Sequence, residues 1–317
     1  MEKKLLILNP FAERYRARLE PQFPEVTFHS ALDPNEASDI IKETHILFAI
    51  GHAFGDDFIK DASELEWIQS LISGTDTLVA LKTLKKEVLI TSGRGIHGPQ
   101  MSEMAFLHML NLARGYPRML RNQDQRVWER WPQSLLYQKT VGILGIGVIA
   151  EELARKCKAF NMTVYGISST VREVEGIDRF FRREQLPEAA AMVDFLIILV
   201  PYSPETDKIV NEKVISAMKP SAYLINLARG GVLDEDALIE ALKAGKIAGA
   251  GLDVYSEEPL PENHPFWGMK NVMMTPKLGG MSDIYPEQVM PILEKNLRYF
   301  LDGNRHKMIN IVERRRK

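Results

Sequence analysis

The stretch Thr140-Val-Gly-Ile-Leu-Gly145-Ile-Gly147-Val-Ile-Ala150 decides the fold of this chain. Its apolar run, Val141 to Leu144, is typical of a buried strand, and helical spacing of apolar residues follows the glycines. A strand that enters Gly-x-Gly-x-x-Ala and continues as a helix is the context of a dinucleotide-binding turn. Gly145 permits the tight turn, Gly147 lets the backbone approach a pyrophosphate, and Ala150 lets the helix pack on the strand.

The first turn of that helix offers N–H groups and a partial positive charge to phosphates. A second strand follows at Thr163 to Gly166, as a dinucleotide-binding unit requires. The alternative is a strand–helix turn in an α/β protein that binds no nucleotide. We favour the dinucleotide site because both flanking elements are present.

Composition sets the broad class of the protein. Its 317 residues, 45% of them hydrophobic and 26% charged, predict a globular protein of two domains. A net charge of −2 argues against nucleic acid or a membrane surface as a partner. The single cysteine, Cys157, and the lack of a signal-peptide pattern predict a cytoplasmic protein. No cluster of His, Cys and carboxylate residues has metal-ligand spacing, so we expect no metal.

Short apolar runs alternate with helical patterns along the chain, which predicts parallel, helix-covered sheets. The expected strands are Leu5–Leu8, Val26–Phe28, Ile46–Ile50, Trp67–Leu71, Val88–Thr91, Phe195–Val200, Ala222–Asn226, Ala248–Val254 and Val272–Met274. The expected helices include Ala12–Leu19, Asn35–Lys42, Asp234–Ala244 and a final one, Ser282–Leu301, kinked or restarted at its prolines. We expect one discontinuous domain, 1–99 with 286–317, and a dinucleotide-binding domain, 100–285.

Between these two parts lies Ser102 to Trp131, which has the pattern of a crossing helix followed by a second helix after Pro117. Trp128, Trp131 and Tyr137 cluster just before the central strand. They are either packing aromatics or a dimerisation arm, since aromatic residues are enriched at interfaces.

Five further stretches place polar residues at the ends of apolar runs, where ligands of open α/β sheets bind. The Ser73-Gly74 loop exposes backbone N–H groups that can hold a carboxylate, although in isolation an ordinary turn is the simpler explanation. Arg229 ends an apolar strand, where its planar guanidinium can bind a carboxylate and a ketone oxygen, or simply lie exposed. The other stretches are Val200–Thr206, Gly251–Pro261 and Met274–Gly280.

Together with the glycine turn, these stretches resemble the D-isomer-specific 2-hydroxyacid dehydrogenases, which include glyoxylate/hydroxypyruvate reductases and phosphoglycerate dehydrogenases. The resemblance covers nearly the whole chain, and Asn226-Leu-Ala-Arg229-Gly-Gly and Asp253-Val…Glu258-Pro-Leu-Pro261 are its most specific strings. It implies an α/β fold with two Rossmann-like or flavodoxin-like doubly wound domains and an active-site cleft between them.

The resemblance also implies roles for individual residues. Ser73 and Gly74 would bind the substrate carboxylate, and Arg229 would grip that carboxylate and polarise the 2-keto oxygen. Glu258 would stand behind the acid/base, and Asp253 would orient the nicotinamide carboxamide. The implied cofactor-binding residues are Gly145, Gly147, Val148, Ile149, Pro201, Thr206, Ala228, Asp253 and Gly279.

The chain departs from the family at the acid/base position. The family usually has Thr-Pro-His, whereas this chain has Thr275-Pro-Lys277, and neither His97 nor His264 obviously takes over. An ammonium paired with Glu258 can donate a proton and stabilise a developing alkoxide. Alternatively Lys277 only stabilises charge and activity is weak, or catalysis is lost and the fold serves as a cofactor sensor. A charged lysine is a good acid but a poor base, so we expect the enzyme to work in the direction of reduction.

The second departure concerns the cofactor. Sites that prefer NAD carry an acidic residue about 20 residues after the first glycine, to hold the ribose 2′-hydroxyl. Here the strand ends at Ser168, followed by Ser169, and no carboxylate occurs before Glu173. Two hydroxyls with Arg172 suit a 2′-phosphate, so we favour NADP(H) over NAD(H).

We therefore predict NAD(P)H-dependent reduction of a short 2-keto acid to a D-2-hydroxy acid. Arg229 would bind the substrate, Lys277 would donate the proton while paired with Glu258, and a homodimer would form through the Rossmann domain. The alternative is a catalytically weak or inactive NAD(P)-sensing binding protein of the same fold.

Overall fold

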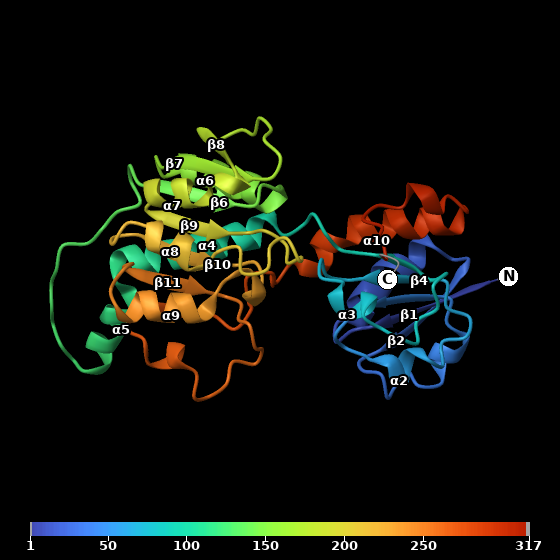
Figure 1. The fold of residues 1–317 in the computed structure, drawn as a ribbon. Coiled ribbons are helices and arrows are strands. Elements are labelled where there is room, and N and C mark those ends of the chain that lie inside the picture. The colour runs from blue at the N-terminus through green and yellow to red at the C-terminus, as the bar shows by residue number, and fades with distance from the viewer. Residues whose placement is uncertain (1, 315–317) are drawn as a thin grey trace. The chain divides into compact units, whose positions relative to one another are not determined.

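The computed structural model describes residues 2–314, which form two compact units (Figure 1). Unit 1 comprises residues 1–96 and 282–317, and unit 2 comprises residues 97–281. The boundaries expected from the sequence lie a few residues further along the chain.

Unit 1 is built on a parallel sheet with the strand order β2-β1-β3-β4-β5. This is the flavodoxin-like order, which reverses between β1 and β3. Its strands are β1 (Lys3–Leu8), β2 (Val26–Ala31), β3 (Ile46–Ala49), β4 (Trp67–Ser70) and β5 (Leu89–Thr91), and its helices are α1 (Ala12–Leu19), α2 (Asp56–Ile59), α3 (Asp76–Val79) and α10 (Tyr285–Leu301).

The helix expected at Asn35–Lys42 is wrong. Turns occupy most of this segment, and only a short 3₁₀ helix forms, at Ile40–Glu43. The Asp33 carboxylate accepts from the backbone N–H groups of Asn35 (2.7 Å) and Glu36 (3.2 Å), and the Glu36 carboxylate accepts from the N–H of Leu32 (2.8 Å). These local bonds give the backbone a turn in place of a helix.

The final helix, α10, packs in unit 1, where Val289, Leu293 and Leu297 join the core cluster around Trp67. It runs without a restart, with Pro286 in the first turn, where proline is tolerated, and Pro291 inside. Buried Asn296 donates to the Gln69 side chain (3.0 Å) and accepts from the N–H of Ile309 (2.8 Å). The C-terminal segment is therefore tied to the β4 strand through polar as well as apolar contacts.

Unit 2 is built on a parallel sheet with the order β12-β11-β10-β9-β6-β7-β8. This is the Rossmann order with one extra strand, and it reverses between β6 and β9. No helix or strand was expected for the segments that form β8, α7 and α8. The strands are β6 (Thr140–Leu144), β7 (Thr163–Ser168), β8 (Arg179–Arg182), β9 (Phe195–Ile198), β10 (Tyr223–Asn226), β11 (Gly249–Leu252) and β12 (Val272–Met274).

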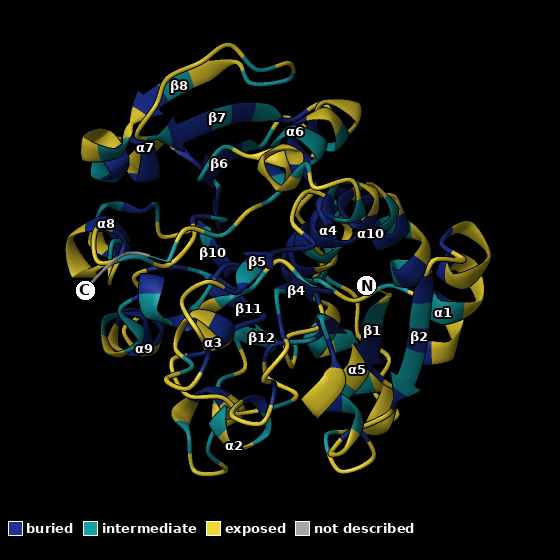
Figure 2. Ribbon diagram, turned by 90° about the vertical axis from the view of Figure 1, so that its right-hand side faces the viewer, coloured by how far each residue is buried: buried dark blue, intermediate teal, exposed yellow. Residues whose placement is uncertain are grey.

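Helices cover both faces of this sheet, and each face has its own core cluster. Figure 2 shows the central strands mostly buried, the edge strand β8 partly exposed, and the outer faces of the helices exposed. Cys157 lies fully buried in one of the two clusters, which accounts for it as a packing residue. The helices are α4 (Gly98–Arg114), α5 (Tyr116–Asp124), α6 (Val148–Ala159), α7 (Leu186–Met192), α8 (Glu212–Ala217) and α9 (Glu235–Lys243). No helix in residues 2–314 is both long and apolar enough to cross a membrane.

Candidate active site

The glycine turn joins β6 to α6 at the point where the strand order of unit 2 reverses. Gly145 has φ +100°, and a Cβ there would lie 2.7 Å from the backbone nitrogen of Val200. Gly147 precedes the helix in an extended conformation, and a Cβ there would have nothing within 4 Å. Gly145 thus serves the fold, whereas Gly147 faces open space at the start of α6.

These residues fit a dinucleotide. Val148 and Ile149 form the first turn of α6, and Val148 is half exposed. The first N–H groups of a helix have no intrahelical partner, and no side chain caps this helix end. An accessible turn with such donors can hold a pyrophosphate.

At the end of β7, Ser168 and Ser169 lead into the loop that carries Arg172. The Arg172 guanidinium reaches back to α6 and forms an ion pair with Glu151 in its first turn. The Arg172 guanidinium therefore lies near the N-terminal end of α6, where it is already paired with the Glu151 carboxylate.

The loop after β9 contains Pro201 and Thr206. The buried Thr206 hydroxyl donates to the Pro201 carbonyl (2.7 Å) and accepts from the N–H of Ser203 (2.7 Å). Thr206 thus holds the loop together, and its hydroxyl is used within the loop.

The loop after β10 positions Arg229. The buried Asn226 side chain donates to the Arg229 carbonyl (3.0 Å) and accepts from the N–H of Ala228 (3.1 Å). The Arg229 guanidinium donates to the Ala228 carbonyl (2.7 Å). Burial and, to a lesser extent, the charge of Arg229 lower the pKa of His97. A Cβ on Gly280 would lie 3.6 Å from the His97 ring, so His97 lies in this part of unit 2, whereas the expected boundary placed it in the other domain.

Lys277 and Glu258 form an ion pair that joins the loops after β12 and β11. The other carboxylate oxygen of Glu258 accepts from the N–H of Tyr255 (3.3 Å), and the Tyr255 phenol donates to the carbonyls of Leu252 and Thr275 (both 3.0 Å). Lys277 has φ +57°, which residues other than glycine adopt rarely, so its surroundings must hold it. Its side chain is 56% exposed, so the ammonium is accessible to a small molecule.

Asp253 holds the backbone of the Lys277 loop. Its buried carboxylate accepts from the N–H groups of Leu278 and Gly279 (both 2.9 Å) and from the Thr275 hydroxyl (2.6 Å). A Cβ on Gly279 would lie 2.8 Å from that carboxylate, which requires glycine there.

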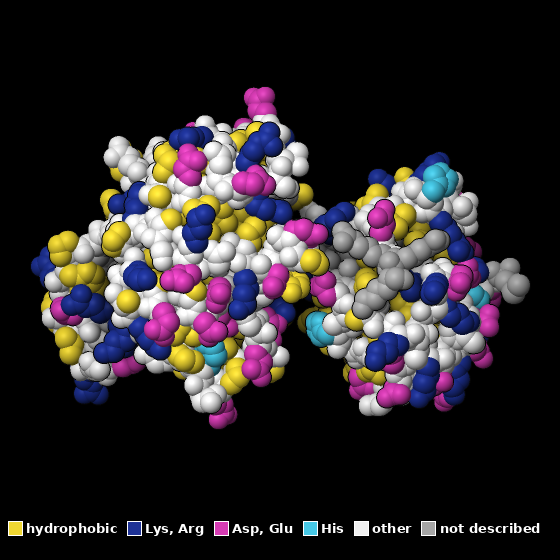
Figure 3. Space-filling model, viewed as in Figure 1, with side chains coloured by type: hydrophobic (Ala, Val, Ile, Leu, Met, Phe, Trp, Pro, Cys, Tyr) yellow, Lys and Arg dark blue, Asp and Glu magenta, His cyan; other side chains and the backbone are white. Residues whose placement is uncertain are grey.

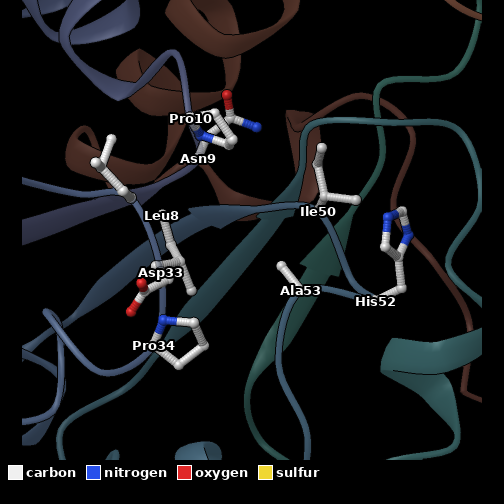
Figure 4. Close-up of a pocket in the computed structure, with 9 residues that line it drawn as sticks. Leu8, Asn9, Pro10, Asp33, Pro34, Ile50, His52 and Ala53 are labelled. Atoms are coloured by element: carbon white, nitrogen blue, oxygen red, sulfur yellow. The ribbon is translucent and has the colours of Figure 1, made fainter.

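The expected substrate loop belongs to unit 1. Ser73 and Gly74 follow β4, and the Ser70 hydroxyl near the carbonyls of Ile72 (2.9 Å) and Gly74 (3.4 Å) shapes the loop. Unit 1 also has a cavity of about 250 Å³ near the ends of β1, β2 and β3 (Figure 4). It is lined by Leu8, Asn9, Pro10, Leu32, Asp33, Pro34, Ile50, His52 and Ala53.

The molecular surface carries both signs of charge. Figure 3 shows Lys and Arg interspersed with Asp and Glu over the visible face. Among the described residues, no group of three or more His, Cys, Asp or Glu side chains is arranged to hold a metal ion.

The glycine turn, the strand order and the strand-end loops define unit 2 as a dinucleotide-binding α/β domain. Residues 106–279 match the family model "D-isomer specific 2-hydroxyacid dehydrogenase, NAD binding domain". A glyoxylate reductase of Pyrococcus furiosus is 30% identical over 96% of this chain and 94% of its own length. The chain belongs to the D-isomer specific 2-hydroxyacid dehydrogenase family, as the sequence motifs predicted.

Other relatives are aligned over less of their length. A D-3-phosphoglycerate dehydrogenase of Methanocaldococcus jannaschii is 30% identical over 95% of this chain, which spans 58% of that relative.

Solved structures of the family resemble the chain throughout. The crystal structure of a family protein from Aeromonas salmonicida has a TM-score of 0.92, with 32% identity over 99% of this chain and 100% of that one. An NADPH-dependent glyoxylate/hydroxypyruvate reductase from Sinorhizobium meliloti, solved with NADP and sulfate, has a TM-score of 0.84, with 25% identity over 98% of each chain.

Proposed function

We propose that the protein reduces a short 2-keto acid to the D-2-hydroxy acid with NADP(H) and that Lys277 donates the proton. The observation that carries this proposal is the Lys277–Glu258 ion pair, which lies in the unit that contains the glycine turn and Arg229. When bound, the nicotinamide would supply the hydride. The relatives named as glyoxylate reductases support the substrate class.

Each residue has a defined task in this reaction. The Lys277 ammonium donates a proton to the carbonyl oxygen of the substrate as charge develops there, and Glu258 holds the ammonium in place. Arg229, fixed by the loop after β10, binds the substrate carboxylate and polarises the keto oxygen. The Ser73-Gly74 loop of unit 1 offers backbone N–H groups that can hold a carboxylate.

The cofactor preference follows from the end of β7. Ser168, Ser169 and Arg172 offer hydroxyls and a guanidinium to a 2′-phosphate, and the Sinorhizobium reductase named as NADPH-dependent supports this preference. The phosphate has to compete with Glu151 for Arg172.

We also propose a homodimer through unit 2. Between α5 and β6 the chain forms a long loop at the margin of unit 2 (Figure 1). Trp128 in this loop is 93% exposed, and Leu135 and Tyr137 are more than half exposed. Burial of these side chains against a second copy would remove a large apolar area from water.

The test is an initial-rate assay with NADPH and NADH and a panel of short 2-keto acids, run in parallel on Lys277→Ala and Lys208→Ala. Lys208 is a matched control because it also has a positive φ (+44°) and an ion pair in unit 2, with Asp234 at 3.8 Å. We expect Lys277→Ala to lose at least about 100-fold in kcat, as is usual for a general acid, and Lys208→Ala to keep its activity.

The alternative is an NAD(P)-sensing binding protein, which the replacement of histidine by Lys277 keeps open. Cofactor binding without turnover of any acid would favour it. Equal rates for the parent and Lys277→Ala would contradict the lysine as proton donor. A rate for oxidation that rises into the alkaline range would support reversible use of Lys277 as a base. A cytoplasmic location stays a prediction from the sequence.

A further inference from the structure

His108 on α4 is fully buried and has one nitrogen without a partner. No hydrogen-bond partner lies near Nδ1, and a Cβ on Gly251 would lie 2.7 Å from that atom, so β11 makes room for the ring by having glycine there. An unpartnered polar atom in the interior destabilises a fold relative to an apolar side chain of similar size. Packing alone therefore does not account for a histidine at this position.

The other ring nitrogen starts a chain of hydrogen bonds. Nε2 of His108 lies 3.2 Å from the Thr275 hydroxyl, which lies 2.6 Å from the Asp253 carboxylate. The carboxylate can only accept, so Thr275 donates to it and accepts from His108. Burial lowers the pKa of His108 to about 4, so at neutral pH the ring carries a single N–H, which this direction assigns to Nε2.

This series of hydrogen bonds ends at the loop that contains Lys277. Asp253 accepts from the N–H groups of Leu278 and Gly279, the two residues after Lys277 (both 2.9 Å). These bonds fix the backbone on one side of Lys277, at the point where its φ is +57°. Thr275 lies on the other side of Lys277, two residues before it, and its hydroxyl links His108 to Asp253.

We propose that His108 is a positioning residue that, through Thr275 and Asp253, holds the Lys277 loop so that the ammonium meets Glu258. His108 orients the Thr275 hydroxyl, the hydroxyl orients the carboxylate, and the carboxylate orients the loop. This inference rests on the proposed role of Lys277 as proton donor, but its structural half can be tested without turnover.

The structural half is tested by amide hydrogen exchange of Leu278 and Gly279 in the full chain. His108→Leu and Thr275→Val remove the hydrogen bond between these two residues. His108→Gln keeps a side-chain donor, and Thr275→Ser keeps the hydroxyl. Ser102→Ala is the control: it removes a buried hydroxyl from the same helix that bonds to the carbonyls of Gly98 and Pro99 and to Lys156, outside the chain. We expect at least about tenfold faster exchange in the two breaking variants and parent-like exchange in the other three.

The catalytic half is tested by reduction kinetics of the same five variants. We expect kcat to fall about tenfold in His108→Leu and Thr275→Val, with KM for the keto acid within about twofold and no further loss in the double variant, as for residues that act as one unit. Thr275→Ser and His108→Gln should restore most of the rate.

The outcomes separate the two proposals. Exchange and kinetics in His108→Leu and Thr275→Val that match Ser102→Ala would overturn the role of His108. Fast exchange in a protein that turns over no keto acid would refute the proposed reaction and support the positioning chain. If His108→Leu fails to fold, Thr275→Val against Thr275→Ser decides the same question, since both keep the histidine.

Discussion

A methyl group added at Gly145 should lower the stability of the fold, whereas one added at Gly147 should lower the affinity for the cofactor. At Gly145 (φ +100°), a Cβ would lie 2.7 Å from the Val200 nitrogen and 2.9 Å from the Leu199 carbonyl carbon. The unfavourable φ and the overlap with backbone together cost about 3 kcal/mol. For a domain of this size, Gly145→Ala should lower Tm by about 6–12 °C.

At Gly147 an added methyl group would contact no other part of the protein. The backbone is extended (φ −135°), which alanine adopts freely, and no heavy atom lies within 4 Å of the added Cβ. We expect Gly147→Ala to change stability by less than about 0.5 kcal/mol. Because the methyl group would occupy the space in front of α6 where a pyrophosphate approaches, it should raise the Kd for the cofactor at least about tenfold.

The assay combines thermal unfolding with a titration of NADPH fluorescence for both variants. A Gly147→Ala protein that binds NADPH as the parent does would refute the assignment of the open space to the phosphates. A Gly145→Ala protein as stable as Gly147→Ala would refute the geometric argument for Gly145.

Three further predictions concern other parts of unit 2. The free energy of unfolding should fall by about 3 kcal/mol as the pH drops from 6.5 to 4, because His108 has a pKa of about 4 in the folded protein and 6.5 in the unfolded chain, and so takes up its proton on unfolding. Urea unfolding of His108→Gln should lack this pH dependence. Arg172→Ala should raise the Kd for NADPH about tenfold and change the Kd for NADH by less than about twofold. Glu151→Gln should lower the Kd for NADPH about twofold, because it removes the carboxylate that competes for Arg172. Equal effects on both cofactors would argue against a 2′-phosphate site. Trp128→Ser should weaken the dimer at least about tenfold in sedimentation experiments, and an unchanged sedimentation coefficient would exclude Trp128 from the interface.

Local patterns were sufficient to place most elements of the fold. Short apolar runs predicted strands at or near β3, β6 and β9, because a strand buried on both faces is apolar throughout. The prediction failed where side chains competed locally for the backbone, as Asp33 and Glu36 do in the segment expected to be a helix. It gave no element for β8, whose exposed Arg179 and Arg182 hide the apolar pattern of an edge strand.

The sequence by itself determined the family, the dinucleotide turn and the residues that stand at the strand ends, because these depend on short strings of fixed spacing. It also led us to expect Lys277 at the position where the family usually has histidine, 19 residues after Glu258. Only the tertiary structure decided which side chains meet. It gave Arg172 a partner in Glu151 and brought His108, 167 residues away in the sequence, to Thr275. The Lys277–Glu258 pair, by contrast, was expected from the family resemblance. Contacts such as that of His108 with Thr275 arise when helices and strands distant in sequence pack together, and no local pattern encodes them.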